Sequence, residues 1–66
     1  MYVSDSVARK ILKEAGAVRI SAEASAELQK YVNRIAFETA TKAVKLSKHA
    51  KRKTVEVSDI RLAMHE

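Results

Sequence analysis

Residues 21–50 read SAEASAELQKYVNRIAFETATKAVKLSKHA, and this stretch decides the fold. It contains neither proline nor glycine, and its larger apolar side chains return every three or four residues. That spacing predicts one continuous amphipathic helix. Ser21 is a suitable N-cap, and Glu23 lies in the first turn, where the helix dipole favours a negative charge. Such a helix would hold about 29 residues and would be roughly 43 Å long at the usual rise per residue.

A short helix is predicted before the long one. Apolar residues with helical spacing place it over roughly residues 5–15. One of the polar residues at positions 4–6 can cap its start, and Gly16 follows its last apolar residue, as glycine commonly does at a helix end. The next four residues, 17–20, are β-prone and too short for another helix.

A second short helix is predicted at the other end of the chain. Apolar residues over 60–64 favour it, with Ser58 and Asp59 in its first turn. The pair before it, 54–55, is again β-prone. The pattern is all-α and short–long–short, and because no linker or repeat divides the chain, we expect residues 1–66 to form a single domain.

The long helix also carries apolar residues on a second side. Phe37 and Val44 form this line together with the small residues Ala36 and Ala40. So wide an apolar band needs more cover than two short helices supply, and a compact globule of this length would be only ~28 Å across. The simplest solution is a second copy of the chain whose long helix crosses this one. The alternative is a monomer that leaves Phe37 exposed.

The composition excludes several classes of protein. The chain has 66 residues and no cysteine, so it offers neither a disulfide nor a thiolate metal site. No apolar run approaches the ~18 residues of a membrane span, and no signal-peptide core is visible, so we expect a soluble intracellular protein. No motif indicates an enzyme, and we expect no cofactor, no metal site and no small-molecule substrate. A chain this small is marginal alone, which again favours an oligomer.

The charge suggests a polyanionic partner. The chain has 13 lysines and arginines against 8 acidic residues, which gives a net charge of +5, and the positive charge gathers toward both ends. A merely soluble, positively charged surface is the alternative. If two long helices cross antiparallel, residues 17–20 of one chain lie near residues 51–55 of the other. Arg19 and Lys51-Arg52-Lys53 would then form one basic patch that suits successive phosphates of a curved duplex.

Two segments carry a resemblance to a known family. Residues 49–55, HAKRKTV, followed by Asp59, resemble the second-loop signature of histones and are very similar to the corresponding stretch of eukaryotic histone H4. Residues 15–21, AGAVRIS, resemble the first-loop motif of archaeal histones. The three-helix pattern matches the histone fold, so the resemblance covers essentially the whole chain. It implies head-to-tail handshake dimers that bend double-stranded DNA and can join into tetramers or longer multimers.

The resemblance implies a DNA-binding role for both loops. Arg19 matches an arginine that enters the minor groove, Thr54 the partner-chain residue that pairs with it, and Lys53 a phosphate-binding lysine. Lys10 lies where archaeal members usually have arginine, so it keeps the charge and loses the planar fork. Lys51 replaces a glycine common in archaeal members, which should strengthen the phosphate contact. The residues implied to bind DNA are Lys10, Lys13, Arg19, Ser21, Lys51, Arg52, Lys53 and Thr54.

The resemblance also implies structural roles. Arg52 and Asp59 match a salt bridge within the chain that braces the second loop. His49 would bond Asp59 of a neighbouring dimer in a four-helix bundle, or it is only a last-turn histidine that caps its helix. The residues implied for the dimer–dimer interface are Leu46, His49, Asp59 and Leu62.

Together these features predict an archaeal-type histone. It would bind double-stranded DNA without sequence specificity as a homodimer, and it would lie on the chromosome or nucleoid in the cytoplasm. A histone-fold subunit of a heteromeric transcription factor is the alternative, and it would need a different partner chain. A third possibility, a protein–protein interaction module without DNA function, would not be retained on heparin.

Overall fold

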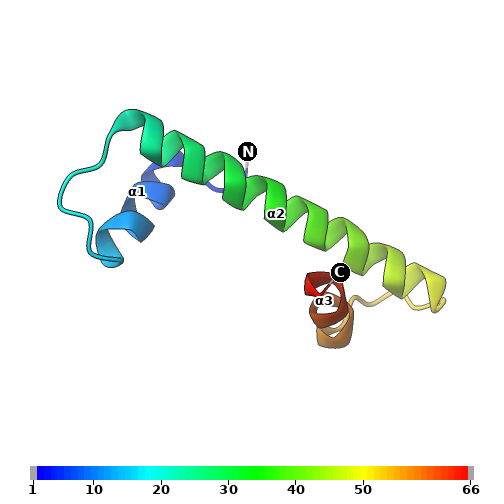
Figure 1. Ribbon diagram of the computed structural model, residues 1–66. Coiled ribbons are helices and arrows are strands. Elements are labelled where there is room, and N and C mark those ends of the chain that lie inside the picture. Colours follow the sequence, from blue (N-terminus) through cyan, green and yellow to red (C-terminus); the bar gives the residue numbers. More distant parts are fainter. Residues whose placement is uncertain (1, 66) are drawn as a thin grey trace. The chain divides into compact units, whose positions relative to one another are not determined.

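The computed structural model describes residues 2–65, which form three helices (Figure 1). They are α1 (Asp5–Glu14), α2 (Ala22–His49) and α3 (Val57–Met64). α2 holds 28 residues, against 10 in α1 and 8 in α3. Residues 2–65 form no strand, so the predicted all-α, short–long–short pattern is confirmed. Of the helices in this range, none is long and apolar enough to cross a membrane.

Serine side chains cap the first two helices. Ser4 Oγ accepts a hydrogen bond from the backbone N–H of Val7 at 3.3 Å, so Ser4 is the N-cap among the three predicted candidates. Ser21 Oγ accepts one from the backbone N–H of Ala24 at 3.0 Å. Each bond satisfies an amide group that a helix leaves unpaired in its first turn. The predicted start of α2 is therefore confirmed.

The α1 helix ends in a Schellman motif. The N–H of Gly16 donates to the carbonyl of Lys13, and the N–H of Ala17 donates to that of Leu12, both at 3.0 Å. Gly16 has φ +114°, which glycine adopts far more readily than a residue with a Cβ. The helix ends at Glu14, one residue before the predicted boundary, because the next residue already belongs to the cap.

The α2 helix ends in the same motif with a different residue at its turn. The N–H of Lys51 donates to the carbonyl of Lys48, and the N–H of Arg52 donates to that of Ser47, both at 2.9 Å. Lys51 occupies the position that Gly16 has after α1, and it also has a positive φ, +59°. The sequence did not predict this conformation.

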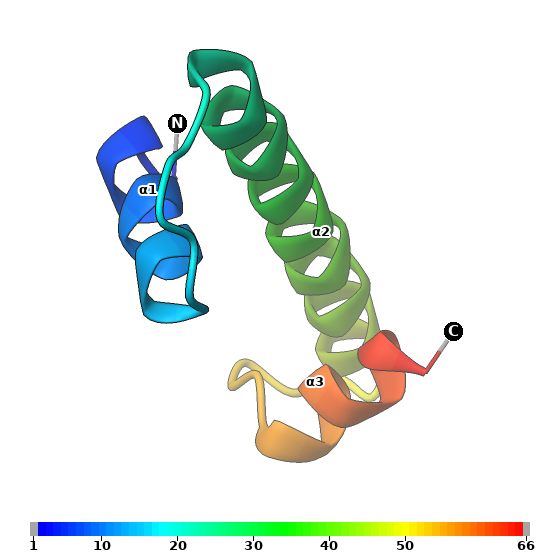
Figure 2. The same ribbon diagram turned by 60° about the vertical axis from the view of Figure 1, so that its left-hand side comes forward.

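The described residues group into two compact halves that divide α2 between Arg34 and Ile35. In the first half, α1 lies beside the N-terminal turns of α2 (Figure 2). The residues before α1 are tied to α2 by Val3, whose N–H donates to Asn33 Oδ1 at 2.6 Å. The carbonyl of Val3 accepts from Asn33 Nδ2 at 3.1 Å and from Gln29 Nε2 at 3.0 Å. The side chains of Asn33 and Gln29 thus bond both the N–H and the carbonyl of Val3.

Asp5, the first residue of α1, adds a second connection to α2. Ser25 has no exposed surface, and its Oγ donates to Asp5 Oδ1 at 2.7 Å. Arg9 Nε lies 3.2 Å from Asp5 Oδ2. The hydrogen bond from Ser25, supported by Arg9, holds the pKa of Asp5 below its usual value. This contact fixes the start of α1 on the first half of α2.

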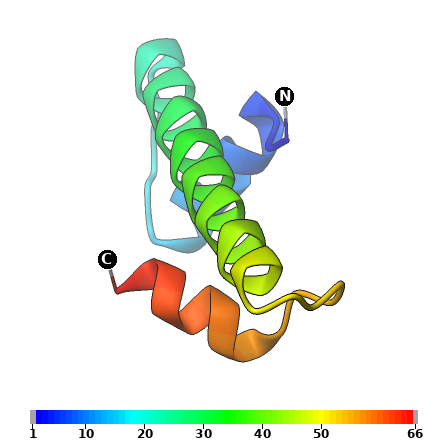
Figure 3. The ribbon, with the colours of Figure 1, turned by 90° about the vertical axis from the view of Figure 1, so that its right-hand side faces the viewer.

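The second half contains the C-terminal part of α2 and α3, which turns back toward that part of α2 (Figure 3). Small residues are buried here: Ala43 has no exposed surface, and Ala63 and Ser47 have 3% each. Ser47 Oγ donates to the carbonyl of Val44 at 2.9 Å, so this buried hydroxyl is satisfied within its own helix. The small side chains let α2 and α3 approach closely.

Most of the larger apolar side chains remain exposed. Among residues 2–65, the buried apolar residues are three alanines, Ala8, Ala43 and Ala63. Phe37, on the predicted second apolar side of α2, is 56% exposed. A folded domain normally buries its Val, Ile, Leu and Phe side chains, whereas residues 2–65 of a single copy form no fully buried core of such large residues. The exposed set is Tyr2, Val7, Ile11, Val18, Tyr31, Ile35, Phe37, Val44, Val55, Val57, Ile60, Leu62 and Met64.

Candidate nucleic-acid interface

In the first half, the residues predicted to bind DNA lie on the surface. Lys10 and Lys13 are exposed on α1, and Arg19 is exposed in the first loop, residues 15–21. Ser21 ends this loop as the N-cap of α2. The first half therefore presents three exposed cations on α1 and the loop that follows it.

In the second half, the second loop, residues 50–56, holds the other predicted DNA-binding residues. Lys51 and Lys53 are exposed, whereas Arg52 between them is partly buried. Thr54 is exposed, and its carbonyl accepts a hydrogen bond from Arg52 Nη1 at 3.1 Å. The two lysines thus remain on the surface on either side of an arginine that is held against the protein.

Arg52 and Asp59 form a two-pronged ion pair. Arg52 Nη2 lies 2.7 Å from Asp59 Oδ1, and Arg52 Nη1 lies 2.9 Å from Asp59 Oδ2. Asp59 Oδ2 also accepts the backbone N–H of Glu56 at 2.8 Å, which caps the start of α3. The structure thus brings together the pair that the resemblance implied. The guanidinium joins the second loop to α3 and fixes the loop backbone.

The ion pair is charged at any physiological pH. The guanidinium of Arg52, together with the backbone N–H of Glu56, lowers the pKa of Asp59 to about 2. The carboxylate in turn raises the pKa of Arg52 above its already high value. Both terminal nitrogens of Arg52 therefore donate to partners within the chain, and Arg52 braces the second loop against α3.

Two of the residues predicted for a dimer–dimer interface lie together on α2. Leu46 and His49 line a shallow groove with two lysine side chains, Lys42 and Lys45. Leu62 on α3 is 53% exposed. Asp59, the fourth predicted residue, differs from these three in its burial, because it is only 4% exposed in the single chain. The groove is thus both apolar and positively charged.

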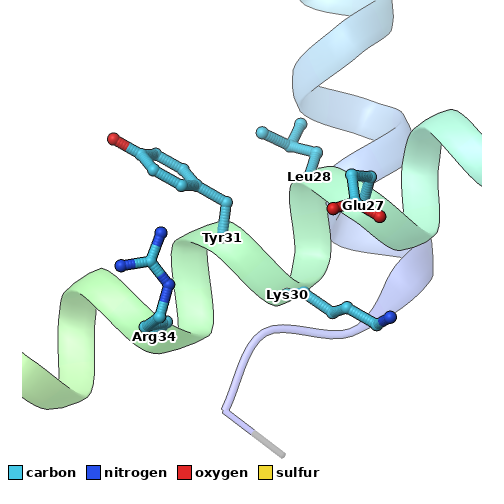
Figure 4. Close-up of a pocket in the computed structure, with 5 residues that line it drawn as sticks. All are labelled: Glu27, Leu28, Lys30, Tyr31 and Arg34. Carbon is cyan, nitrogen blue, oxygen red and sulfur yellow. The ribbon is translucent and has the colours of Figure 1, made fainter.

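A further hollow lies on the first half of α2 (Figure 4). The guanidinium carbon of Arg34 lies 5.3 Å from the centre of the Tyr31 ring, within the range of a cation–π contact. The sequence did not predict this contact, although the i, i+3 spacing of the two residues was an available signal. The residues that line the hollow are Glu27, Leu28, Lys30, Tyr31 and Arg34.

The positive φ of Lys51 was also missed by sequence reasoning. Lysine itself carries no signal for this conformation, and the one available signal was the resemblance, which implied glycine at this position in related chains. Within the part of the chain that the structure describes, no three histidine or acidic side chains are grouped so that they could hold a metal ion.

Comparison with known proteins identifies the family. Residues 6–64 match the model of a family described as histone-like transcription factor (CBF/NF-Y) and archaeal histone. A protein of Methanocaldococcus jannaschii named "Probable archaeal histone 3" is 49% identical over 55 residues, which cover 83% of this chain and 82% of that protein. An archaeal histone of Thermococcus zilligii, one of the HAN1 subunits, is 40% identical over 55 residues, with the same coverage of both chains. The exposed basic loops and the three-helix pattern are therefore those of a member of the family of archaeal histones and histone-like transcription factors, to which this chain belongs.

Proposed function

We propose that this chain is a histone that binds double-stranded DNA as a homodimer, without sequence specificity, and compacts it. The observation that carries the proposal is the second loop, where Lys51 and Lys53 are exposed on either side of the braced Arg52. Exposed cations on a fixed backbone suit a polyanion with a regular spacing of phosphates. Membership of the archaeal histone family supports the same function.

The exposed apolar surface supports the dimer. Phe37 and Leu62 are more than half exposed in the single chain, and Ile35 and Val44 on α2 are also exposed. Burial of one such side chain contributes about 1.5–3 kcal/mol, so a handful of them is enough to drive association. A helix of 28 residues is about 42 Å long, which gives a second copy room to pack along it.

The dimer would bring the two kinds of loop together. When the α2 helices cross antiparallel, the first loop of one chain neighbours the second loop of its partner. Arg19 then lies beside Lys51 and Lys53 of the partner chain, and it can enter the minor groove while Thr54 of that chain pairs with it. Arg52 braces the loop through Asp59, and the resemblance also implies a DNA contact for it. Further backbone contacts come from Lys10, Lys13 and the start of α2 at Ser21.

The salt dependence of binding tests DNA recognition. If a dimer neutralises about 8 phosphates, the logarithm of the association constant falls with the logarithm of salt concentration at a slope near −7. A slope near zero would remove the DNA-binding proposal. Arg19→Ala should weaken binding to unrelated duplexes by a similar factor, and Lys30→Gln, which removes one exposed charge outside both loops, is the matched control. A loss confined to one DNA sequence would contradict backbone recognition.

Nuclease digestion of DNA saturated with the protein tests compaction. Wrapping by multimers predicts protected fragments that grow in regular steps, whereas a continuous smear argues against it. In the dimer–dimer contact that the resemblance implies, His49 of one dimer bonds Asp59 of another. His49→Ala should then remove the longer fragments and keep the shortest. In the cell, this function would place the protein on the chromosome.

A self-association measurement separates the homodimer from one chain of a heteromeric transcription factor. A chain that needs a different partner would be unfolded or aggregated on its own, because its apolar side chains would have no cover. Retention on heparin at physiological salt separates these two DNA-binding proteins from a module that binds only proteins. The proposed histone should be a folded dimer and should be retained.

A further inference from the structure

The second loop begins with a residue in a conformation that most residues avoid. Lys51 has φ +59°, and no other residue besides glycine has a positive φ in the described range 2–65. The two hydrogen bonds at the end of α2, both 2.9 Å, fix this conformation as part of the helix cap. For a residue with a Cβ, the left-handed region is disfavoured by roughly tenfold or more in population.

The first loop forms the same helix cap without backbone strain. After α1, the same pair of cap hydrogen bonds is formed with Gly16 at the positive-φ position. Glycine has no Cβ and accepts this conformation readily. A glycine at position 51 would therefore close the α2 helix as well as the lysine does, with less strain in the backbone.

Stabilisation of the helix dipole does not account for the lysine. Cations near the C-terminal end of a helix are favourable, but α2 already has Lys48 and His49 in its last turn. Lys51 also has no acidic neighbour among the ion pairs of this loop, where Arg52 pairs with Asp59 and Glu56. Its side chain is exposed on a loop whose backbone Arg52 holds in place.

We propose that Lys51 is a phosphate-binding group whose strained conformation lowers the stability of the fold. Glycine at this position would then give a more stable protein that binds DNA less tightly. This inference rests on the DNA-binding function proposed above, and it makes Lys51 the second phosphate ligand of the loop, beside Lys53. The strain is tolerated because the cap hydrogen bonds and the Arg52 brace determine the backbone on both sides.

Four forms of the full chain test the inference: the natural protein, Lys51→Gly, Lys51→Asn and Lys51→Arg. Thermal unfolding is measured without DNA, and binding to a duplex of random sequence is measured over a range of salt concentrations. Lys51→Gly should raise the unfolding temperature by about 2–5 °C. It should weaken binding at low salt by roughly tenfold or more and reduce the salt slope by about 2 per dimer, since each chain loses one phosphate contact.

The other two variants separate strain from charge. Lys51→Asn removes the charge but tolerates the left-handed region, so it should lose as much affinity as Lys51→Gly with a smaller gain in unfolding temperature. Lys51→Arg keeps both the charge and the strain, and it should match the natural protein in both measurements. Lys30→Gln, which removes one exposed charge outside both loops, is the charge-matched control and should leave the salt slope unchanged.

The outcomes are distinguishable. If the natural protein has a steep salt slope and Lys51→Gly keeps both slope and affinity, Lys51 is not a phosphate ligand and this inference is wrong, whereas DNA binding by the remaining cations stands. If Lys51→Gly unfolds at a lower temperature than the natural protein, the lysine is not strained and the inference is again overturned. If the natural protein itself shows no salt-dependent DNA binding, the proposed function fails and the inference fails with it.

Discussion

The two loops of this chain turn the backbone in the same way with residues of opposite character. The first loop reaches its positive φ at Gly16 and carries one cation, Arg19, on the rest of its length. The second reaches it at Lys51 and is braced to α3 by the ion pair of Arg52. The difference shows where a strained, charged residue can replace glycine: at a turn that hydrogen bonds and an ion pair hold from both sides.

The largest change in unfolding free energy is expected when the first loop is given a lysine at its positive-φ position, as in the second loop. Gly16→Lys would put a Cβ at φ +114°, well beyond the left-handed region that Lys51 occupies. A Cβ there would meet nothing within 4 Å, so the cost is purely conformational, roughly 2–3 kcal/mol of unfolding free energy. Urea denaturation measures it. Ala15→Lys, which adds the same charge at the neighbouring exposed residue, where φ is −77°, should leave the midpoint nearly unchanged.

An unchanged midpoint for Gly16→Lys would show that the first loop can change its conformation. Glycine would then not be required at the first turn, and the proposed difference between the two loops would be wrong.

A smaller effect on the unfolding free energy should depend on pH, because the second loop is braced by the ion pair of Arg52 and Asp59. The folded-state pKa of Asp59, about 2, lies below the ordinary value of 3.8. A carboxyl group with a lowered folded pKa adds stability above its unfolded pKa and loses that contribution as the pH falls through the folded value. The unfolding free energy should therefore fall between pH 3.8 and pH 2, and Asp59→Asn should remove this part of the decline. Urea midpoints across that range measure it, and parallel curves for the two proteins would contradict it.

The smallest effect is expected at Asp5, which serves the first half of the molecule as Asp59 serves the second. Its pKa is also lowered, chiefly by the Ser25 hydroxyl, but its side chain is 49% exposed, so solvent screens the pairing with Arg9. As for Asp59, the lowered pKa of Asp5 means that the unfolding free energy falls on acidification, just below the ordinary pKa of an aspartate. In the same urea series, Asp5→Asn should change the acid dependence less than Asp59→Asn does. A larger change would reverse the ranking of the two contacts.

The helices could be predicted because their signals are local. Ser21 and Gly16 mark helix ends by their own chemistry, and the apolar spacing defines what lies between them. The contacts of Val3 with Asn33 and of Asp5 with Ser25 could not be predicted, since they join residues that only the packing of α1 on α2 brings together.

The site was predicted by another route. Arg52 and Asp59 are seven residues apart across a loop, and nothing in that spacing identifies them as partners; the family resemblance did. The strain at Lys51 is local, but it follows from the hydrogen bonds that end α2, and a lysine gives no sign of it. The roles of both loops in DNA binding remain predictions.

The central claim is that a second copy of the chain covers the apolar side chains that one copy leaves exposed. Sedimentation combined with thermal unfolding, each over a wide range of protein concentration, tests it most directly. We predict a folded species of twice the chain mass, and an unfolding temperature that rises with concentration because dissociation accompanies unfolding. A folded species of single-chain mass whose unfolding temperature is independent of concentration would contradict the claim.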